Sequence, residues 1–269
     1  MIFFHFREDS IRQLAEAFLI RGFDKFPVEN FQNLYITTFT HYEDKFDVPV
    51  VFPAQNVETP LGKVLEDAGK TQLRIAETYK YAHVTYFFNG HWEPPFKNEY
   101  RVLIPSLNLT HPDEQPELMA PAITDRLVEA IEGQAFDFIL ANYANPDTIG
   151  HSGNYDAGVK TMGVLDEQLG RLLQVCQKPG ITVLITSDHG NLEEMINPMT
   201  AEIETQHDAN PVPLYLIGEE FKGKKFVNWE NIRGETGGIL SDVAPTILEI
   251  MGLDKPAEMD GKSLLRELR

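Results

Sequence analysis

The chain has 269 residues, and its hydrophobic share of 42% and charged share of 24% are ordinary for a globular protein with a sizeable core. A formal net charge of −18, with no obvious basic patch, argues against nucleic acid or an anionic membrane surface as a partner. The single cysteine, Cys176, excludes an intrachain disulfide and fits a reducing, cytoplasmic setting, and no apolar run reaches the length of a membrane span.

The first part of the chain predicts two strands and one helix. The strands are expected at 2–6 and 33–42, and the helix over 11–20 with Asp9 or Ser10 as its N-cap. Several prolines between residues 49 and 60 then break the pattern, so a domain boundary is predicted near residue 57. An apolar strand that begins at the first residue indicates a fragment of something longer.

After residue 57, strands and helices alternate, which predicts a mainly parallel sheet covered by helices on both faces. The expected strands are 72–78, 101–105, 136–141, 181–186 and 212–218, and the main expected helices are 61–69, 122–133, 155–177 and 241–252. The β-branched run 181–186 is expected to be buried on both faces, and 142–153 to be a polar loop. The sequence contains neither of the Gly-rich loops that cradle nucleotide phosphates.

Acidic and imidazole side chains lie next to three of these strands. They are Asp147 and His151, Asp188 and His189, and His207. Each histidine alone is more simply a loop or core residue. Because open α/β sheets bind ligands beyond the carboxyl ends of their strands, the three positions together predict a site. Carboxylates with imidazoles suit manganese, cobalt, zinc or magnesium, and this many ligands indicates two neighbouring metals.

The sequence also contains longer motifs. They are AETYKYAHVTYFFNG (76–90), NYANPDTIGHSG (142–153), TSDHGN (186–191), HDANPVP (207–213) and LSDVAPTILEIMG (240–252). With these motifs the chain resembles the cofactor-independent phosphoglycerate mutases of the alkaline phosphatase superfamily, over nearly its whole length. The resemblance implies an alkaline-phosphatase-like α/β fold. It also implies interconversion of 3- and 2-phosphoglycerate in glycolysis through a phosphoserine, with two Mn²⁺ ions, or Mg²⁺ or Co²⁺ in their place.

The resemblance assigns roles to individual residues. One metal is implied to bind Asp147, His151 and His207, and the other metal to bind Asp188 and His189. Lys80 is implied to contact the phosphoryl group, and Arg7 to hold the phosphoglycerate.

The chain departs from the family pattern on its N-terminal side. The resemblance implies that 1–56 is an incomplete α/β remnant of the substrate-binding (transferase) domain, and that 57–269 is the phosphatase-like metal-binding domain. The sequence has no counterpart of the nucleophilic serine or of one aspartate of the second metal site, so that second site is expected to be impaired. Ser187 and Ser152 are more simply small structural residues, because nothing in the sequence activates them. His91 stands where the family usually has a second glycine.

We therefore expect the C-terminal part of a phosphoglycerate mutase that is inactive alone. Its expected partners are 2- and 3-phosphoglycerate in the full enzyme and a missing N-terminal fragment. Two alternatives stay open: a degenerate or split-protein metal-binding domain that acts by association, and a metal-dependent phosphatase that uses water. The site at Asp147, His151 and His207 is expected to be the better preserved, because all its matched ligands are present.

Overall fold

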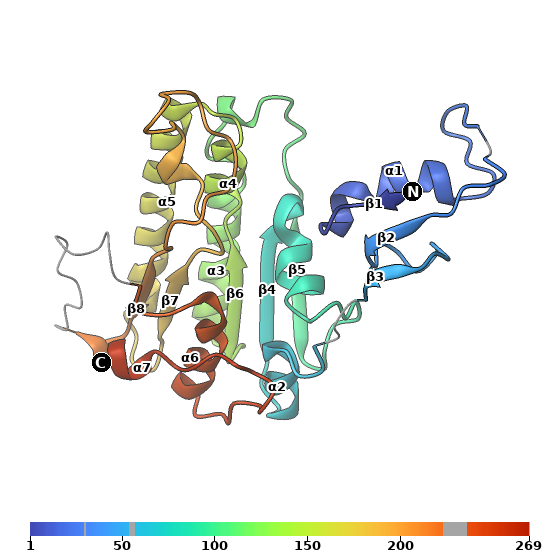
Figure 1. Ribbon diagram of the computed structural model, residues 1–269. Helices are drawn as coiled ribbons and strands as arrows, with labels where there is room; N and C mark the ends of the chain where they lie inside the picture. The colour runs from blue at the N-terminus through green and yellow to red at the C-terminus, as the bar shows by residue number, and fades with distance from the viewer. Residues whose placement is uncertain (30, 54–56, 223–235, 269) are drawn as a thin grey trace. The chain divides into compact units, whose positions relative to one another are not determined.

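Figure 1 shows the computed structural model of the chain, which describes residues 1–29, 31–53, 57–222 and 236–268. The chain divides into two compact units, Met1–Asn56 and Val57–Arg269. Within the described ranges, no helix is both long enough and apolar enough to cross a membrane.

The first unit is a parallel sheet with a helix against one face. The strands follow the order β1 (Ile2–Phe3), β2 (Thr37–Thr40) and β3 (Val50–Phe52), and the helix is α1 (Glu8–Leu19). The buried cluster between them consists of Phe3, Ala15, Ile36, Tyr42 and Phe46. The N-cap prediction at Asp9 or Ser10 is wrong, because the extended backbone that a cap requires occurs at Arg7, with φ −81° and ψ 109°.

The opposite face of this sheet carries exposed aromatic rings. Phe4, which directly follows β1, is 79% exposed, whereas its neighbour Phe3 is buried. The rings of Phe4, Phe39 and Phe52 form a row, with centroids 4.6 Å apart for the first pair and 4.8 Å for the second. We call these three rings the aromatic row.

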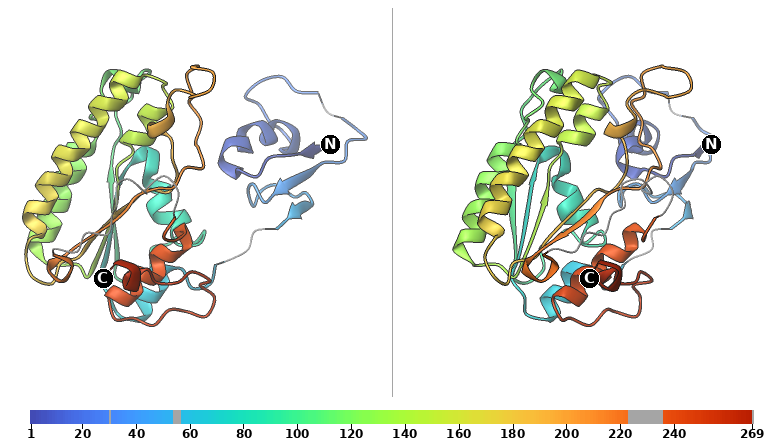
Figure 2. Two further views of the ribbon diagram at one scale, coloured as in Figure 1. Left: turned by 60° about the vertical axis from the view of Figure 1, so that its left-hand side comes forward. Right: turned by 90° about the vertical axis from the view of Figure 1, so that its left-hand side faces the viewer.

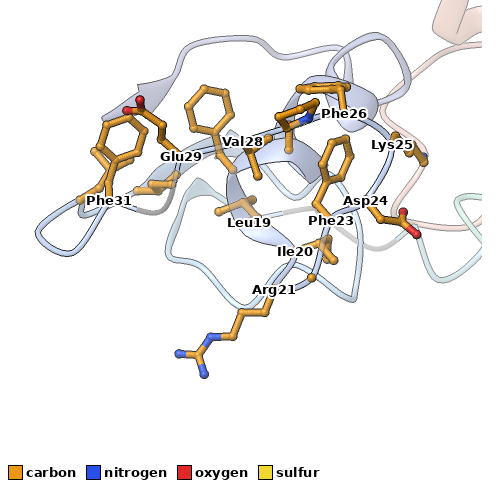
Figure 3. Close-up of a pocket in the computed structure, with 16 residues that line it drawn as sticks. Leu19, Ile20, Arg21, Phe23, Asp24, Lys25, Phe26, Val28, Glu29 and Phe31 are labelled. Carbon is orange, nitrogen blue, oxygen red and sulfur yellow. The ribbon is translucent and has the colours of Figure 1, made fainter.

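The first unit also contains a pocket of about 720 Å³ (Figure 3). Its lining runs from Ala17 in α1 to Ile36 before β2, and the rings of Phe23, Phe26 and Phe31 supply much of its apolar surface. The predicted metal ligands all lie in the second unit, whereas all the residues that line this pocket lie in the first.

The second unit is built around β4 (Gln72–Glu77), every residue of which is buried. β5 (Glu99–Ile104) and β6 (Phe138–Asn142) pair with it in parallel on either side. Helices α3 (Ala120–Gly133) and α5 (Tyr155–Cys176) cover one face, as Figure 2 shows in green to yellow. Helices α2 (Leu61–Asp67) and α6 (Val243–Ile250) pack together around Leu61, Leu65 and Leu248, with Phe138 of β6 against this cluster. The expected α/β class, with parallel strands flanked by helices, is confirmed.

Two local predictions in this unit are wrong. The run 181–186 was expected to be buried on both faces of a parallel sheet, but β7 (Val183–Thr186) pairs antiparallel with β8 (Leu214–Ile217). Within the described residues β7 has a strand partner on one edge only, and none of its side chains is fully buried. The expected polar loop 142–153 contains the short helix α4 (Asn145–Gly150), whose start is favoured by a proline in its first turn.

The remaining elements are short. They are η1 (Thr78–Lys80), η2 (His83–Phe87), η3 (Pro112–Glu114), η4 (Leu192–Glu194), η5 (Glu219–Phe221), η6 (Leu240–Asp242) and α7 (Leu265–Leu268). Among them, η1 and η4 matter most here, because η1 follows β4 directly and η4 follows the segment after β7.

Candidate metal centre

Helix α4 and a distant loop bring three predicted ligands together. Asp147 lies in the first turn of α4, and His151 follows its last residue, so the spacing of four places both side chains on one face of the helix. His207, in the loop before β8, completes the group: its Nε2 is 2.9 Å from Asp147 Oδ1 and 3.1 Å from His151 Nε2. The ligand atoms of these three residues all lie within 4.8 Å of one another.

The orientation of His151 is fixed from outside the group. Its Nδ1 lies 2.7 Å from the carbonyl oxygen of Thr205, and the hydrogen bond requires the imidazole to donate through Nδ1. The ring is therefore oriented with Nε2 toward Asp147, 3.1 Å from Oδ1. A backbone carbonyl that holds the far nitrogen of a histidine is the usual arrangement around metal ligands.

The loop that carries Thr205 approaches α4 closely because of a glycine. Gly153 has φ +69°, and a Cβ atom on it would lie 2.4 Å from a methyl carbon of Ile203 and 3.2 Å from one of Thr205. Only glycine accepts both the backbone conformation and the contact. The GHSG part of the motif at 150–153 thus supplies a ligand and also the space for the loop above it.

Asp147 also forms an ion pair with a lysine. Lys80, at the end of η1, places its Nζ 2.5 Å from Asp147 Oδ2, and the two side chains are only 12% and 18% exposed. Burial by itself raises the pKa of the Asp147 carboxyl, but the hydrogen bond and charge of Lys80, with smaller effects of His151 and His189, outweigh burial and lower the pKa to about 2. The carboxylate is therefore ionised throughout the ordinary pH range, as a ligand must be.

His207 is held in its neutral form. Its pKa is lowered, first by burial and then by the neighbouring His189, although the Asp147 carboxylate acts in the opposite direction. The ring of His189 stacks on that of His207 with centroids 3.6 Å apart. A neutral imidazole is the form that ligates metals, so this environment favours metal binding by His207 at neutral pH.

The structure places the other predicted residues less closely. His189 Nε2 is 3.7 Å from Asp147 Oδ1, whereas Asp188 is 63% exposed and its Oδ1 lies 3.6 Å from His189 Nε2. Within the described ranges, the group of three close ligands consists of Asp147, His151 and His207, and Asp188 does not join it. Arg7 lies in the first unit, at the start of α1.

Residues 19–255 match the family model described as the metalloenzyme superfamily. The chain belongs to the metalloenzyme superfamily. Its relatives include the 2,3-bisphosphoglycerate-independent phosphoglycerate mutases of Pseudomonas fluorescens and Pseudomonas entomophila, 44% and 45% identical over 98% of this chain. These matches cover 50% of each relative, so the chain spans about half the length of the curated relatives it matches.

One solved structure with the same fold is a phosphoglycerate mutase of Leishmania mexicana, crystallised at low cobalt concentration. The TM-score is 0.72 over 93% of this chain and 47% of that chain, at 22% identity. A likeness at this identity concerns the fold alone.

The donor set of this metalloenzyme superfamily member fits a divalent metal. One carboxylate oxygen and two imidazole nitrogens converge from α4 and the loop before β8, and the lowered pKa values of Asp147 and His207 favour their ligating forms. The mixture of oxygen and nitrogen donors suits borderline ions such as Mn²⁺, Co²⁺ or Zn²⁺ better than soft, thiophilic ions.

Two contributors were missed by reasoning from the sequence. Thr205 acts through its backbone carbonyl, for which no residue type is a signal. Asn191 donates from its side-chain amide to Asp147 Oδ1 at 3.3 Å. Its place directly after the Asp188–Gly190 segment was the available signal, because polar residues that follow a strand end at a site are candidates for its supporting contacts.

Proposed function

We propose that this chain is the C-terminal part of a metal-dependent phosphoglycerate mutase that interconverts 3- and 2-phosphoglycerate through a phosphoserine. The observation that carries the proposal is the group of Asp147, His151 and His207 with Lys80 against it. Relatives named as such mutases, 44% identical over 98% of this chain, support the same reading. We place the enzyme in the cytoplasm, which the single cysteine favours.

Each residue of the site would have its own role in binding the metal ions or the substrate. Asp147, His151 and His207 hold one divalent ion, with Mn²⁺ as the first choice and Mg²⁺ or Co²⁺ as alternatives, and Asp188 and His189 offer ligands to a second ion. A bound ion of this kind neutralises charge on phosphoryl oxygens. Lys80 supplies a charged hydrogen bond to the phosphoryl group. Arg7 holds the carboxylate or phosphate of the glycerate, which a guanidinium can grip with two parallel hydrogen bonds.

We propose further that the chain alone is inactive, because neither Ser187 nor Ser152, the two serines beside predicted ligands, is activated. The Ser187 hydroxyl donates to the backbone carbonyl of His189 at 2.8 Å, and the Ser152 hydroxyl donates to that of Ile149 at 2.6 Å. A nucleophilic hydroxyl is activated by a neighbouring base or by coordination to a metal ion, and a hydrogen bond to a backbone carbonyl supplies neither.

The missing function would come from a second polypeptide that corresponds to the other half of the relatives. Two observations support this partner: the chain spans half the length of those relatives, and the aromatic row is an exposed apolar surface of the kind that proteins cover. In this case units 1–56 and 57–269 are the end of the substrate-binding domain and the phosphatase-like domain. The alternative of a metal-binding domain that acts by association rests on the same surface.

The test is fragment complementation. The purified chain is assayed for conversion of 3- to 2-phosphoglycerate with Mn²⁺, alone and mixed with the half of the Pseudomonas fluorescens relative that this chain does not match. We expect no conversion alone, conversion in the mixture, and loss of that conversion with Asp147→Ala. Robust conversion by the chain alone, with contaminating enzyme excluded, would contradict the proposal.

A phosphatase that uses water is the second candidate, and the openness of the site favours it. The side chains of His151 and His207 are 46% and 32% exposed, so water and a phosphate ester can approach the group. Hydrolysis of a generic phosphate ester by the chain with Mn²⁺, abolished by Asp147→Ala, would establish this activity. Turnover that survives Asp147→Ala would exclude this site as its source.

A further inference from the structure

One buried side chain outside the predicted ligand set contacts the centre directly. Asn191 is 5% exposed, and its amide nitrogen donates to Asp147 Oδ1 at 3.3 Å. Its amide oxygen is buried and has no hydrogen-bond partner in the described part of the chain. Leaving a buried acceptor unpaired costs free energy, so the position of this amide requires a reason other than its own hydrogen bonding.

Asn191 is locked in place from two elements. Its backbone N–H donates to Glu193 Oε2 at 3.0 Å, which fixes the chain where η4 begins. On the other side, a Cβ atom on Gly150 of α4 would lie 2.3 Å from the amide oxygen of Asn191 and 2.6 Å from its Cγ. Gly150 therefore leaves the space that the amide fills, and the amide fits between the segment after β7 and the helix that carries Asp147.

The contact with Asn191 restricts the orientation of the Asp147 carboxylate. Oδ2 is held by Lys80, and Oδ1 is approached by His151, His207 and the Asn191 amide. With a donor on each oxygen, rotation of the carboxylate is restrained. An amide does this without adding charge, whereas a cation at this place would repel a metal ion and a carboxylate would repel Asp147.

We infer that Asn191 is a positioning residue that holds the Asp147 carboxylate in the orientation in which it meets a metal ion together with His151 and His207. The inference rests on the proposed metal centre. Residues that orient metal ligands in this way commonly contribute 10- to 100-fold to metal affinity. Gly150 contributes to the same positioning, because any side chain there would displace the Asn191 amide.

The test compares Mn²⁺ affinity by calorimetry in the wild-type chain and in Asn191→Leu, which keeps the approximate shape and removes the donor. We expect binding about 10- to 100-fold weaker in this variant. Asn191→Ser, which is smaller and cannot clash with Gly150, gives the same comparison if the leucine variant does not fold. Asn197→Ser is the matched control: the Asn197 amide oxygen accepts from the backbone of Met199 and Thr200 in a turn, and its variant should bind Mn²⁺ like the wild type.

A second readout separates positioning from a merely structural role. The visible absorption of the Co²⁺-loaded chain reports the ligand geometry, and we expect its bands to shift in both Asn191 variants but not in Asn197→Ser. Unchanged affinity, or weaker binding with an unchanged Co²⁺ spectrum and a matching loss of metal-free stability, would overturn the inference. Failure of the wild-type chain to bind Mn²⁺ or Co²⁺ would instead refute the metal centre itself.

Discussion

Asp147 is the side chain on which the candidate centre converges. Its two carboxylate oxygens are approached by an ammonium group, two imidazoles and an amide, all from segments that are far from α4 or at its end. A single carboxylate can serve so many donors because it is ionised, and it stays ionised because Lys80 opposes the effect of burial.

The ion pair can be tested with Lys80→Met, which removes the cation and keeps an unbranched stem. We expect the pKa of Asp147 to rise from about 2 to above its ordinary value of 3.8, because burial is then less opposed. A depressed carboxyl pKa contributes stability that is present above the unfolded pKa and lost as the pH falls through the folded pKa. The variant should therefore lose about 2 kcal/mol at pH 7, and this difference should shrink below pH 3.8.

The measurements are a carboxyl NMR titration of Asp147 and urea unfolding at pH 7 and pH 3. Lys70→Met is the matched control, because Lys70 and Asp137 form a surface pair at 3.4 Å with side chains 35% and 40% exposed. Such pairs contribute little to stability, so this variant should unfold like the wild type. A pKa of Asp147 that stays near 2 in Lys80→Met would show that Lys80 is not the cause.

Residue types were easier to predict than the contacts that hold them. The carboxylates and imidazoles at strand ends identify themselves by their chemistry, and Asp147, His151 and His207 do lie together. The partners of these ligands were missed for physical reasons: Thr205 contributes only a carbonyl, and the contact of Asn191 depends on the space left by Gly150, which lacks a Cβ. His91 has φ +71°, the region that glycine adopts most readily.

At the scale of elements, the Asp242 carboxylate connects the segment of η6 and α6 to a segment near the C-terminus. Asp242 is 8% exposed; it accepts from the backbone N–H of Lys262 at 2.7 Å and from that of Ile239 at 2.9 Å. These two hydrogen bonds, that of Lys262 first, lower the pKa of Asp242. The Asp242 side chain therefore links the two ends of the segment 239–262.

Asp242→Ala should destabilise the second unit by about 2–3 kcal/mol at pH 7, because two charge-assisted hydrogen bonds are lost. Asp242→Asn should cost less, since it keeps one acceptor. Because the pKa of Asp242 is lowered, its carboxylate stabilises the folded protein above the unfolded pKa, and this stabilisation is lost as the pH falls through the folded pKa. The stabilities of the wild type and Asp242→Asn should therefore converge in acid. Urea unfolding at pH 7 and pH 3 checks this, with exposed Asp254→Asn as control. Equal stability of Asp242→Ala and wild type at pH 7 would refute it.

Periodicity predicted the long elements and failed for the short ones near the site. α3 and α5 follow their apolar faces, because burial selects those residues along the whole element. α4 is too short for a periodic signal, and its segment was predicted to be a polar loop, although a proline in the first turn favours the start of a helix. The apolar run of β7 was read as doubly buried, but whether a strand has neighbours on both edges depends on the rest of the sheet.

At the scale of the whole molecule, the two units differ in what an added metal can do. All three close ligands lie in Val57–Arg269, and the first unit, Met1–Asn56, contributes none of them. A ligand that binds only the folded form stabilises the unit that holds it.

Calorimetric unfolding with and without Mn²⁺ tests this separation. At an Mn²⁺ concentration of 100 times Kd, the second unit should gain about 2.7 kcal/mol, and the transition of the first unit should not move. Asp147→Asn should abolish the shift. A single transition that moves as a whole would show that the two units unfold together, contrary to this expectation.

The ligands of the centre are unevenly spaced along the chain, and this has a consequence for its topology. Asp147 and His151 are one helical turn apart, but His207 lies 56 positions after His151. An ion bound by all three, as proposed, closes that long loop in the way a disulfide would. By the usual loop-entropy relation, a cross-link of this span restricts the unfolded chain by about 4 kcal/mol. With this proposed ion bound, a protein with one cysteine would have a reversible cross-link that depends on the supply of metal instead of the redox state of its surroundings.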